Sequence, residues 1–431
     1  MGKKVDMKLP RRSAIAMQAG RIAARASQLM GRGSGGMIGG AIAEKISPKI
    51  LAQLAAQKKT VVVSGTNGKS TTTAMVRAAL NTIGQTASND KGDNMGSGVL
   101  SALMNQPDAP YAVCEVDELH VPLVSAKIRP AAFVLLNLSR DQLDRVGEIG
   151  HVEKRLRAAV DDNPQATVIA NCDDPLIVSA AMDSPRVIWV SVGSRWYNDS
   201  VSFPRGGKPI VRQGEDWYVK DSPYRRPDPD WMVREGVLIN CADESQRYSL
   251  DLAVPGQANQ GNAAQAIVAA HALGVPMADA VEAVRAVQTV AGRYATYCVN
   301  GRQIRMLLAK NPAGWQEAIT MINTEIPNLI IDVNGQIADS TDLSWLWDVD
   351  FDELARTYSR VIACGDRGLD LAIRLQYAGI DVTYVPGIMQ ALEACPSQAK
   401  VELLANYTAF RDAKKIFDRV GTVSGAMTEE E

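Results

Sequence analysis

The segment GTNGKSTTT, residues 65–73, directly follows a run of β-branched residues at 60–63. Side chains of this kind favour extended backbone, whereas the residues after Lys69 have the apolar spacing of a helix. Gly65 and Gly68 allow backbone N–H groups to turn toward a polyphosphate, and the helix adds its positive N-terminal end. A strand, a glycine turn and a helix in this order predict an α/β fold with a nucleotide site.

The loop is shorter than the full Walker pattern, because Val63 stands where that pattern begins with glycine. Lys69 would reach the β- and γ-phosphates of ATP, and the Ser70 hydroxyl would hold Mg²⁺. The residues predicted to line the nucleotide site are Gly65, Thr66, Asn67, Gly68, Lys69, Ser70 and Thr71. The alternative is a glycine turn that joins a strand to a helix and binds nothing.

Composition excludes several other classes of function. The chain has 431 residues, 46% of them hydrophobic, which suffices for two or three domains with sizeable cores. Its net charge of −2 gives no electrostatic reason to expect nucleic acid as a partner. The six cysteines form no C-x-x-C pair, which argues against a zinc ribbon or a disulfide framework and fits a reducing cytosol.

The N-terminal segment is basic, and its pattern predicts one amphipathic helix packed on the first domain, then a glycine-rich turn over residues 31–40. Arg21 and Arg25 interrupt its apolar residues, so it lacks the apolar core of a targeting peptide. We expect no transmembrane segment, because no stretch of the chain approaches the roughly 18 to 20 apolar residues that a membrane span needs.

From residue 60 onward, short apolar runs alternate with helical patterns, which predicts mostly parallel sheets flanked by helices. Strands are expected at 60–65, 111–116, 131–138, 166–172 and 186–192, and in a second unit at 302–310, 328–334, 360–365, 382–387 and 400–406. Residues 195–250 break this alternation and predict a small antiparallel excursion. We expect a helical segment over residues 1–55, an ATP-binding middle domain over 56–297 and a further α/β domain over 298–431.

Several segments resemble the Mur ligases, which join amino acids to cell-wall precursors through an acyl phosphate. GTNGKSTTT resembles their nucleotide loop. EVDE ends a predicted strand, where the resemblance implies that Glu115 binds Mg²⁺. NLSRDQLDRVGE resembles another family segment, although Gln142 stands where many relatives have histidine.

Two later segments extend the resemblance. PGQANQGNAAQA resembles the family's asparagine-containing helix start, which implies that Asn262, and less directly Asn259, contacts adenine. GRY resembles the domain junction, which implies that Arg293 touches the phosphates. The implied fold is a P-loop central domain of the Mur ligase type with a Rossmann-like C-terminal α/β domain.

Four segments of the C-terminal half resemble the MurT family, the Mur-ligase-like subunits of lipid II isoglutaminyl synthases: LLAKNPAGW, ADSTDLSWLWD, CGDRGLDLAIRLQYAG and LANYTAF. The resemblance implies ATP-dependent amidation of the α-carboxyl of D-isoglutamate in the lipid II stem peptide. The resemblance also implies that a separate GatD-type glutaminase supplies the ammonia. It implies further that the enzyme acts in the cytoplasm, at the inner face of the membrane. The alternatives are a Mur-type ligase that adds a free amino acid to a UDP-linked peptide or a folate, and a nucleotide-binding scaffold without catalysis.

The sequence departs from that family in two places. Many relatives carry four zinc-binding cysteines in the middle domain, but the corresponding positions here hold Phe203, Gly206, Val219 and Ser222. None of these side chains binds zinc, so we expect no zinc and expect aromatic and proline packing to hold this region together. The family's A-D-G-x-D motif has Ser340 in place of its glycine, which removes easy access to positive φ.

The segment ADSTDLSWLWD contains the residue expected to act with the partner. The resemblance implies that an aspartate here completes the glutaminase's Cys–His pair, and we choose Asp342, with Asp348 as the runner-up. The alternative is a helix N-terminus, in which Asp342 is a cap and Trp345 and Trp347 pack inward. The chain has three histidines and no cysteine in a nucleophile elbow, so ammonia is expected from elsewhere.

Overall fold

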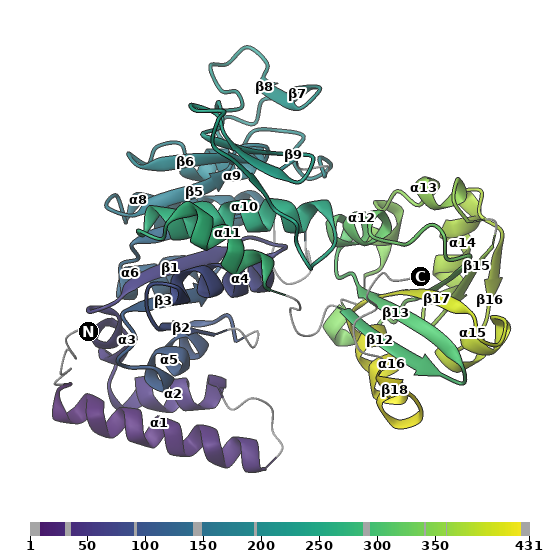
Figure 1. The fold of residues 1–431 in the computed structure, drawn as a ribbon, viewed down its shortest axis with the longest axis horizontal. Helices are drawn as coiled ribbons and strands as arrows, with labels where there is room; N and C mark the ends of the chain where they lie inside the picture. The colour runs from purple at the N-terminus through teal and green to yellow at the C-terminus, as the bar shows by residue number, and fades with distance from the viewer. Residues whose placement is uncertain are drawn as a thin grey trace. The chain divides into compact units, whose positions relative to one another are not determined.

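The computed structural model describes residues 9–30, 36–89, 93–140, 149–193, 196–287, 294–339, 342–358 and 360–423. By its internal contacts the chain divides into two compact units, Met1–Ser139 with Glu148–Gln288 and Arg140–Gly147 with Thr289–Glu431. Each unit contains a sheet flanked by helices, as the alternating sequence pattern predicts (Figure 1).

The first unit contains ten helices and eleven strands among its described residues. The helices are α1 (Arg11–Leu29), α2 (Gly36–Ile46), α3 (Ile50–Ala55), α4 (Lys69–Asn81), α5 (Gly96–Asn105), α6 (Val121–Ile128), α8 (Ile149–Asp161), α9 (Pro175–Ala181), α10 (Gln257–Ala272) and α11 (Met277–Arg285). The strands are β1 (Lys59–Ser64), β2 (Thr86–Ser88), β3 (Tyr111–Glu115), β4 (Ala132–Leu135), β5 (Thr167–Asn171), β6 (Val187–Ser191), β7 (Ile210–Gln213), β8 (Asp216–Val219), β9 (Trp231–Arg234), β10 (Val237–Asn240) and β11 (Arg247–Ser249).

Nine of these strands form one sheet, in the order β11-β10-β9-β6-β5-β4-β1-β3-β2. Strand β1 pairs in parallel with β3 on one side and with β4 on the other. The chain continues from β1 toward β2 and β3 and later crosses to β4, so the strand order reverses beside β1. In open α/β sheets, ligands bind at the carboxyl ends of the strands at such a switch point.

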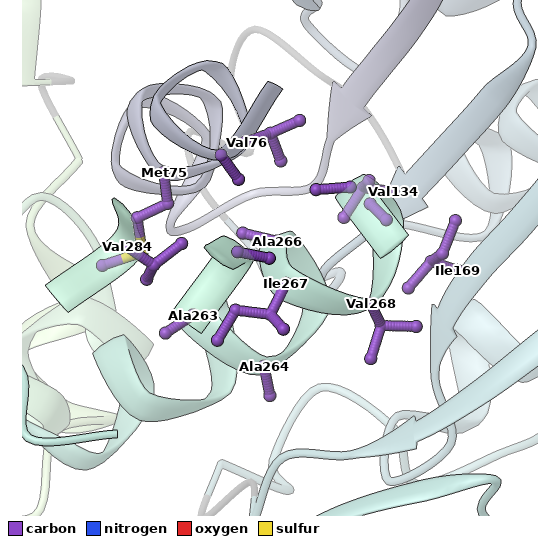
Figure 2. Packing of buried hydrophobic residues seen from close by; sticks show 14 of the residues in the cluster. Met75, Val76, Val134, Ile169, Ala263, Ala264, Ala266, Ile267, Val268 and Val284 are labelled. Carbon is purple, nitrogen blue, oxygen red and sulfur yellow. The ribbon is translucent and has the colours of Figure 1, made fainter. Parts of the chain in front are cut away.

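Helix α10 supplies much of the core that supports this edge of the sheet. Its residues Asn259 and Gly261–Ala270 are buried, so the helix is enclosed nearly all round rather than amphipathic. Figure 2 shows Ile267 and Val268 of α10 near Val134 and Ile169 of the sheet, in the same cluster as Met75 of α4. The small alanines of α10 let α4 and α11 approach it closely, which fixes the helix that follows the P-loop.

The N-terminal segment forms two helices, not a helix and a turn. Helix α1 is as predicted, but residues 36–40 belong to α2, so the glycine-rich turn expected there is wrong; residues 31–35 lie outside the described part of the chain. The glycines serve close packing: a Cβ on Gly39 would lie 2.8 Å from the Gly20 oxygen, and one on Gly40 1.8 Å from the Ser97 oxygen. Glycine therefore allows helix–helix contact here rather than chain reversal.

The antiparallel excursion is confirmed. Strands β7 and β8 form a separate antiparallel pair, and β9, β10 and β11 extend the main sheet as an antiparallel edge. Phe203 stacks on Tyr224 with ring centroids 4.7 Å apart and lies 5.9 Å from Trp217. Together with Val219 and Val178, these rings form a small apolar core, so the expected aromatic packing is present around Phe203.

The second unit is built on a seven-stranded sheet in the order β16-β15-β14-β17-β13-β12-β18. Its strands are β12 (Tyr294–Val299), β13 (Arg302–Leu308), β14 (Asn328–Asp332), β15 (Val361–Cys364), β16 (Val382–Tyr384), β17 (Lys400–Ala405) and β18 (Thr422–Val423). Its helices are α12 (Pro312–Thr320), η1 (Ile337–Asp339), η2 (Ser344–Trp347), α13 (Asp352–Ala355), α14 (Gly368–Tyr377), α15 (Ile388–Ala394) and α16 (Tyr407–Val420). Strands β13 to β17 are parallel, whereas β12 and β18 are antiparallel additions at the edge.

All ten predicted strands are present in the two units. The sequence patterns did not predict the short strands β2 and β18, and they assigned β12 to a junction between domains. No helix among the described residues is both long enough and apolar enough to cross a membrane.

Candidate functional site

The P-loop lies between β1 and α4, at the switch point of the first sheet. Gly65 has φ 140° and Gly68 has φ 89°, conformations that glycine adopts without a steric penalty. Gly68 is the residue immediately before α4, so the loop delivers its backbone N–H groups to the positive end of that helix. The conformation expected from the two glycines is therefore present.

The segment after β4 fixes the loop from the side. The Asn67 backbone N–H donates to Asn137 Oδ1 over 2.9 Å, and Asn137 Nδ2 donates back to the Asn67 oxygen over 3.0 Å. The Thr66 hydroxyl donates to the Ser139 oxygen and accepts from the Ser139 N–H, at 3.2 and 3.0 Å. Asn137 and Ser139 were not assigned a role from sequence, although both lie in the NLSRDQ segment that marks this strand end.

The Lys69 ammonium folds back over the loop. Its Nζ donates to the Gly65 and Thr66 oxygens at 2.6 and 3.2 Å and forms an ion pair with Glu118 Oε2 at 3.2 Å. Both charged side chains are largely buried, so the pair is poorly screened by water. Burial raises the pKa of the neighbouring Asp117, and the Glu118 carboxylate adds to that rise.

Glu118 is the charged residue of the site that the sequence did not predict, in addition to Asn137 and Ser139. It lies in the same EVDE segment as Glu115, but it follows the strand end by three residues, so strand pattern alone gave no reason to place it beside Lys69. Only the path of the chain after β3 brings its carboxylate to the loop.

Glu115 is the last residue of β3 and is buried. Its backbone pairs with Val63 of β1, two residues before Gly65, and Asn89 bonds both its N–H and its carbonyl oxygen at 2.8 Å. Ser70 is half-buried in the first turn of α4. The two oxygen donors predicted for Mg²⁺ thus lie on adjacent elements at one end of the sheet.

Asn262 and Asn259 are both buried in the first half of α10. Asn262 Nδ2 donates to Asn259 Oδ1 over 3.2 Å, and Asn259 Nδ2 donates to the Pro255 oxygen over 2.6 Å. The Asn262 amide also packs on the P-loop, because a Cβ on Gly68 would lie 2.5 Å from its Oδ1. Gly68 is therefore required for close approach as well as for its positive φ.

The expected Arg293 and Gln142 lie outside the described residues. Thr71 is buried at the start of α4. Among the described residues, no group of three or more histidine, cysteine, aspartate and glutamate side chains is arranged to hold a metal ion.

In the second unit, Asp342 is exposed and its Oδ1 accepts from the Ser344 N–H over 2.8 Å. This bond lowers the pKa of the Asp342 carboxyl. The bond closes a turn just before the short helix η2, whose N-cap residue is Leu343 and which has no side-chain cap, so the capping role considered for Asp342 is wrong. Of the two tryptophans expected to pack inward, Trp345 contacts Trp315 with centroids 5.8 Å apart, but Trp347 is 56% exposed. The inward packing is therefore wrong for Trp347.

Two family models match the chain. The Mur ligase middle domain matches residues 63–270, which contain the P-loop, Glu115, Glu118 and Asn262, and the MurT ligase C-terminal domain matches residues 308–410. The chain therefore joins a middle domain of the Mur ligase type to a C-terminal domain of the MurT type. It is therefore an enzyme of the ligase class, in a family that depends on ATP.

Curated relatives carry the name of a MurT subunit, and solved structures share the fold. The chain is 28% identical to "Lipid II isoglutaminyl synthase (glutamine-hydrolyzing) subunit MurT" of Streptococcus pneumoniae over 94% of this chain and 97% of that protein. It is 27% identical to the subunit of the same name from Staphylococcus aureus over 86% and 89%. Its fold matches a pseudomurein peptide ligase type C from Methanothermus fervidus, with TM-score 0.68 and 16% identity over 86% of this chain and 81% of that one. It also matches MurF from Acinetobacter baumannii, with TM-score 0.63 and 16% identity over 88% and 80%.

Proposed function

We propose that this MurT-type chain is the synthetase subunit of a lipid II isoglutaminyl synthase. It would use ATP to activate the α-carboxyl of D-isoglutamate in the lipid II stem peptide, and ammonia would then convert it to D-isoglutamine. One observation supports the proposal most: the same chain contains a P-loop, whose lysine is buried and ion-paired, and a C-terminal domain of the MurT type.

The chemistry explains the need for ATP. A carboxylate does not accept ammonia directly, because its oxygen is a poor leaving group. Transfer of the γ-phosphoryl group gives an acyl phosphate and ADP; ammonia then attacks the carbonyl carbon and phosphate departs. Lys69, with the N–H groups of the loop, would stabilise the charge on the transferring phosphoryl group, which is mainly positioning and electrostatics. Asn262 and Asn259 would contact adenine, and Arg293 the phosphates.

The oxygen donors suit a hard divalent cation. We propose that Ser70 and Glu115 hold Mg²⁺, which binds carboxylate and hydroxyl oxygens together with substrate phosphates and neutralises their charge. Glu115→Gln keeps the size of the side chain but removes its charge, so it should raise the Mg²⁺ concentration needed for half-maximal activity. An unchanged Mg²⁺ dependence would make Glu115 structural.

Four of the six cysteines are poorly suited to release ammonia from glutamine, because they are buried. Cys114, Cys172, Cys364 and Cys395 are buried, and burial raises the pKa of Cys114 to about 12. A thiol that stays protonated is a weak nucleophile. We therefore propose that a separate GatD-type glutaminase supplies the ammonia and that Asp342 acts with it, in keeping with relatives that are named as subunits.

We propose that the middle domain binds no zinc, since apolar side chains stand at Phe203 and Val219. Metal analysis of the purified chain should find far less than one zinc per molecule. The site of action would be the cytoplasmic face of the membrane, where the lipid-linked substrate is anchored.

An assay of the purified chain with ATP, Mg²⁺ and lipid II tests the proposed reaction. Ammonium chloride should support formation of the amidated product with release of phosphate, and addition of the glutaminase should allow glutamine to replace it. Product formation with a free amino acid, and none with ammonium, would select the alternative of an amino-acid-adding ligase.

A further inference from the structure

Helix α1 has one face that packs against its unit and an opposite face that is exposed to solvent. Ser13, Ala16, Gly20 and Ser27 are buried, and a Cβ on Gly20 would lie 2.6 Å from the Gly39 oxygen of α2. Figure 1 shows α1 on the outside of its unit, with α2 between it and α5. Among the residues that the structure describes, α1 packs on its unit through this inner face alone.

The outer face carries two parallel rows of side chains. Ile15, Ile22 and Leu29 are 64%, 67% and 90% exposed, and they recur every seven residues, which places them along one side of the helix. Arg11 and Arg25 form a second row. Arg11 precedes Ile15 by four residues and Arg25 precedes Leu29 by four, so each arginine lies beside the apolar row on the helix surface. Large apolar side chains on a helix face that has no packing partner mark an interaction surface.

The arginines of α1 divide into two functional pairs. The Arg12 guanidinium donates to the Ile46 oxygen, and that of Arg21 donates to the Met104 oxygen, so these two hold α1 on its unit. Arg11 and Arg25 are exposed, and neither has a carboxylate partner among the residues that the structure describes. Their charges are not needed to hold the helix in place.

The positive charge of the N-terminal segment indicates which kind of partner this face can bind. Residues 1–43 contain eight lysines and arginines and a single acidic residue, Asp6, although the whole chain has net charge −2. A second copy of the chain would bring two arginine rows together, and like charges repel. A bilayer with anionic headgroups offers negative charge to the arginines and an apolar boundary to the isoleucines.

We propose that the outer face of α1 docks on an anionic lipid bilayer, with Ile15, Ile22 and Leu29 in the headgroup boundary and Arg11 and Arg25 against the lipid phosphates. The helix lies parallel to the surface over about 27 Å, the length of its 11–29 span. This binding rests on α1 alone and does not depend on the amidation chemistry, so either proposal can fail without the other.

Co-sedimentation of the full chain with vesicles tests the docking. The chain should bind vesicles that contain phosphatidylglycerol, bind pure phosphatidylcholine vesicles far less, and dissociate as salt is raised. The double variant Arg11→Gln/Arg25→Gln should lower the partition coefficient on anionic vesicles about thirtyfold, since each basic residue near such a surface contributes roughly a factor of five. The variant Ile15→Gln/Ile22→Gln should weaken binding about tenfold or more.

A matched control carries Leu123→Gln and Arg234→Gln, two exposed positions on α6 and β9 of the same unit. It should bind vesicles as the parent chain does, and all variants should retain the parent's thermal unfolding and ATP binding. The proposal is overturned if the parent chain does not prefer anionic vesicles, if the control loses as much binding as the α1 variants, or if light scattering shows that the α1 variants abolish a dimer instead.

Discussion

Lys69 places its ammonium on the P-loop oxygens and beside Glu118, in a largely buried position. The proposed phosphoryl transfer needs a cation at this point, because negative charge accumulates on the transferring group. Lys69→Ala should lower amidation from both ammonia and glutamine by about 10² to 10³ or more. The assay is phosphate release with lipid II at saturating ATP.

Lys154→Ala, an exposed lysine on α8, is the control and should keep full activity. Circular dichroism should show that both variants are folded, because the bonds of Lys69 to Gly65, Thr66 and Glu118 lie within the site and outside the hydrophobic core. If Lys69→Ala still amidates at saturating ATP, the nucleotide site has been misplaced.

Helices α2 and α5 meet through a glycine contact that no larger residue can make. A Cβ on Gly40 would lie 1.8 Å from the Ser97 backbone oxygen, far inside contact distance. Gly40→Ala must push the helices apart, and over-packing of this kind typically lowers the free energy of unfolding by about 1 to 3 kcal/mol. Urea unfolding followed by circular dichroism measures the loss.

Gly150→Ala on α8 is the matched substitution, because nothing lies within 4 Å of a Cβ there. In a helix, alanine is favoured over glycine by up to about 1 kcal/mol, so this variant should be as stable as the parent or more so. Equal stability of the two variants would show that the Gly40 contact is not tight in solution.

The carboxyl ends of β14 and β15 hold a buried acid. Burial raises the pKa of Asp332 to about 7, and the carboxylates of Asp366 and Asp412 add to the rise. Between pH 4 and 7 the folded chain therefore retains a proton here that the unfolded chain has lost. The free energy of unfolding should fall as pH rises through this window, with the loss complete above pH 7.

Asp332→Asn removes this titration while keeping the shape of the side chain. Its stability should change less between pH 4 and 7 than that of the parent, by an amount on the order of 1 to 4 kcal/mol. Asp381→Asn, at an exposed position, should follow the parent. Parallel pH profiles for the parent and Asp332→Asn would contradict the raised pKa.

The assembled enzyme is expected to amidate lipid II with glutamine or with added ammonium, and one substitution should distinguish these two activities. Asp342 is exposed and makes a local bond to Ser344, so its replacement leaves the ATP site untouched. In the complex with the glutaminase, Asp342→Asn should lower glutamine-dependent amidation by about 10² or more, because the partner's histidine would lose its orienting acid. Amidation from added ammonium should persist.

Asp348→Asn is the comparison, since Asp348 is the other acid considered for this role. A loss of glutamine-dependent activity in that variant alone would move the assignment to Asp348. A parallel loss of both activities in Asp342→Asn would place Asp342 in the synthetase site or in the fold, and no loss in either would leave Asp342 as a residue of the turn before η2.

The sequence alone determined the features that depend on neighbours along the chain. The strands, the P-loop and α10 follow from the period of apolar residues and from glycines at Gly65 and Gly68, because backbone preference acts over a few residues. The same local signals were misleading where glycine has more than one use. The glycine run after residue 35 predicts a turn from its composition, but it forms α2, because residues without a side chain let neighbouring helices pack closely.

Only the tertiary structure decided which distant residues meet. Glu118 beside Lys69, Asn137 on the P-loop and Asn262 against Gly68 join β3, β4 and α10 to the loop after β1. The spacing of these residues along the sequence does not show that they meet, because the order of the strands in the sheet determines which segments become neighbours. The outward isoleucines of α1 and the exposed Trp347 were hidden for the same reason: burial depends on what the rest of the chain covers.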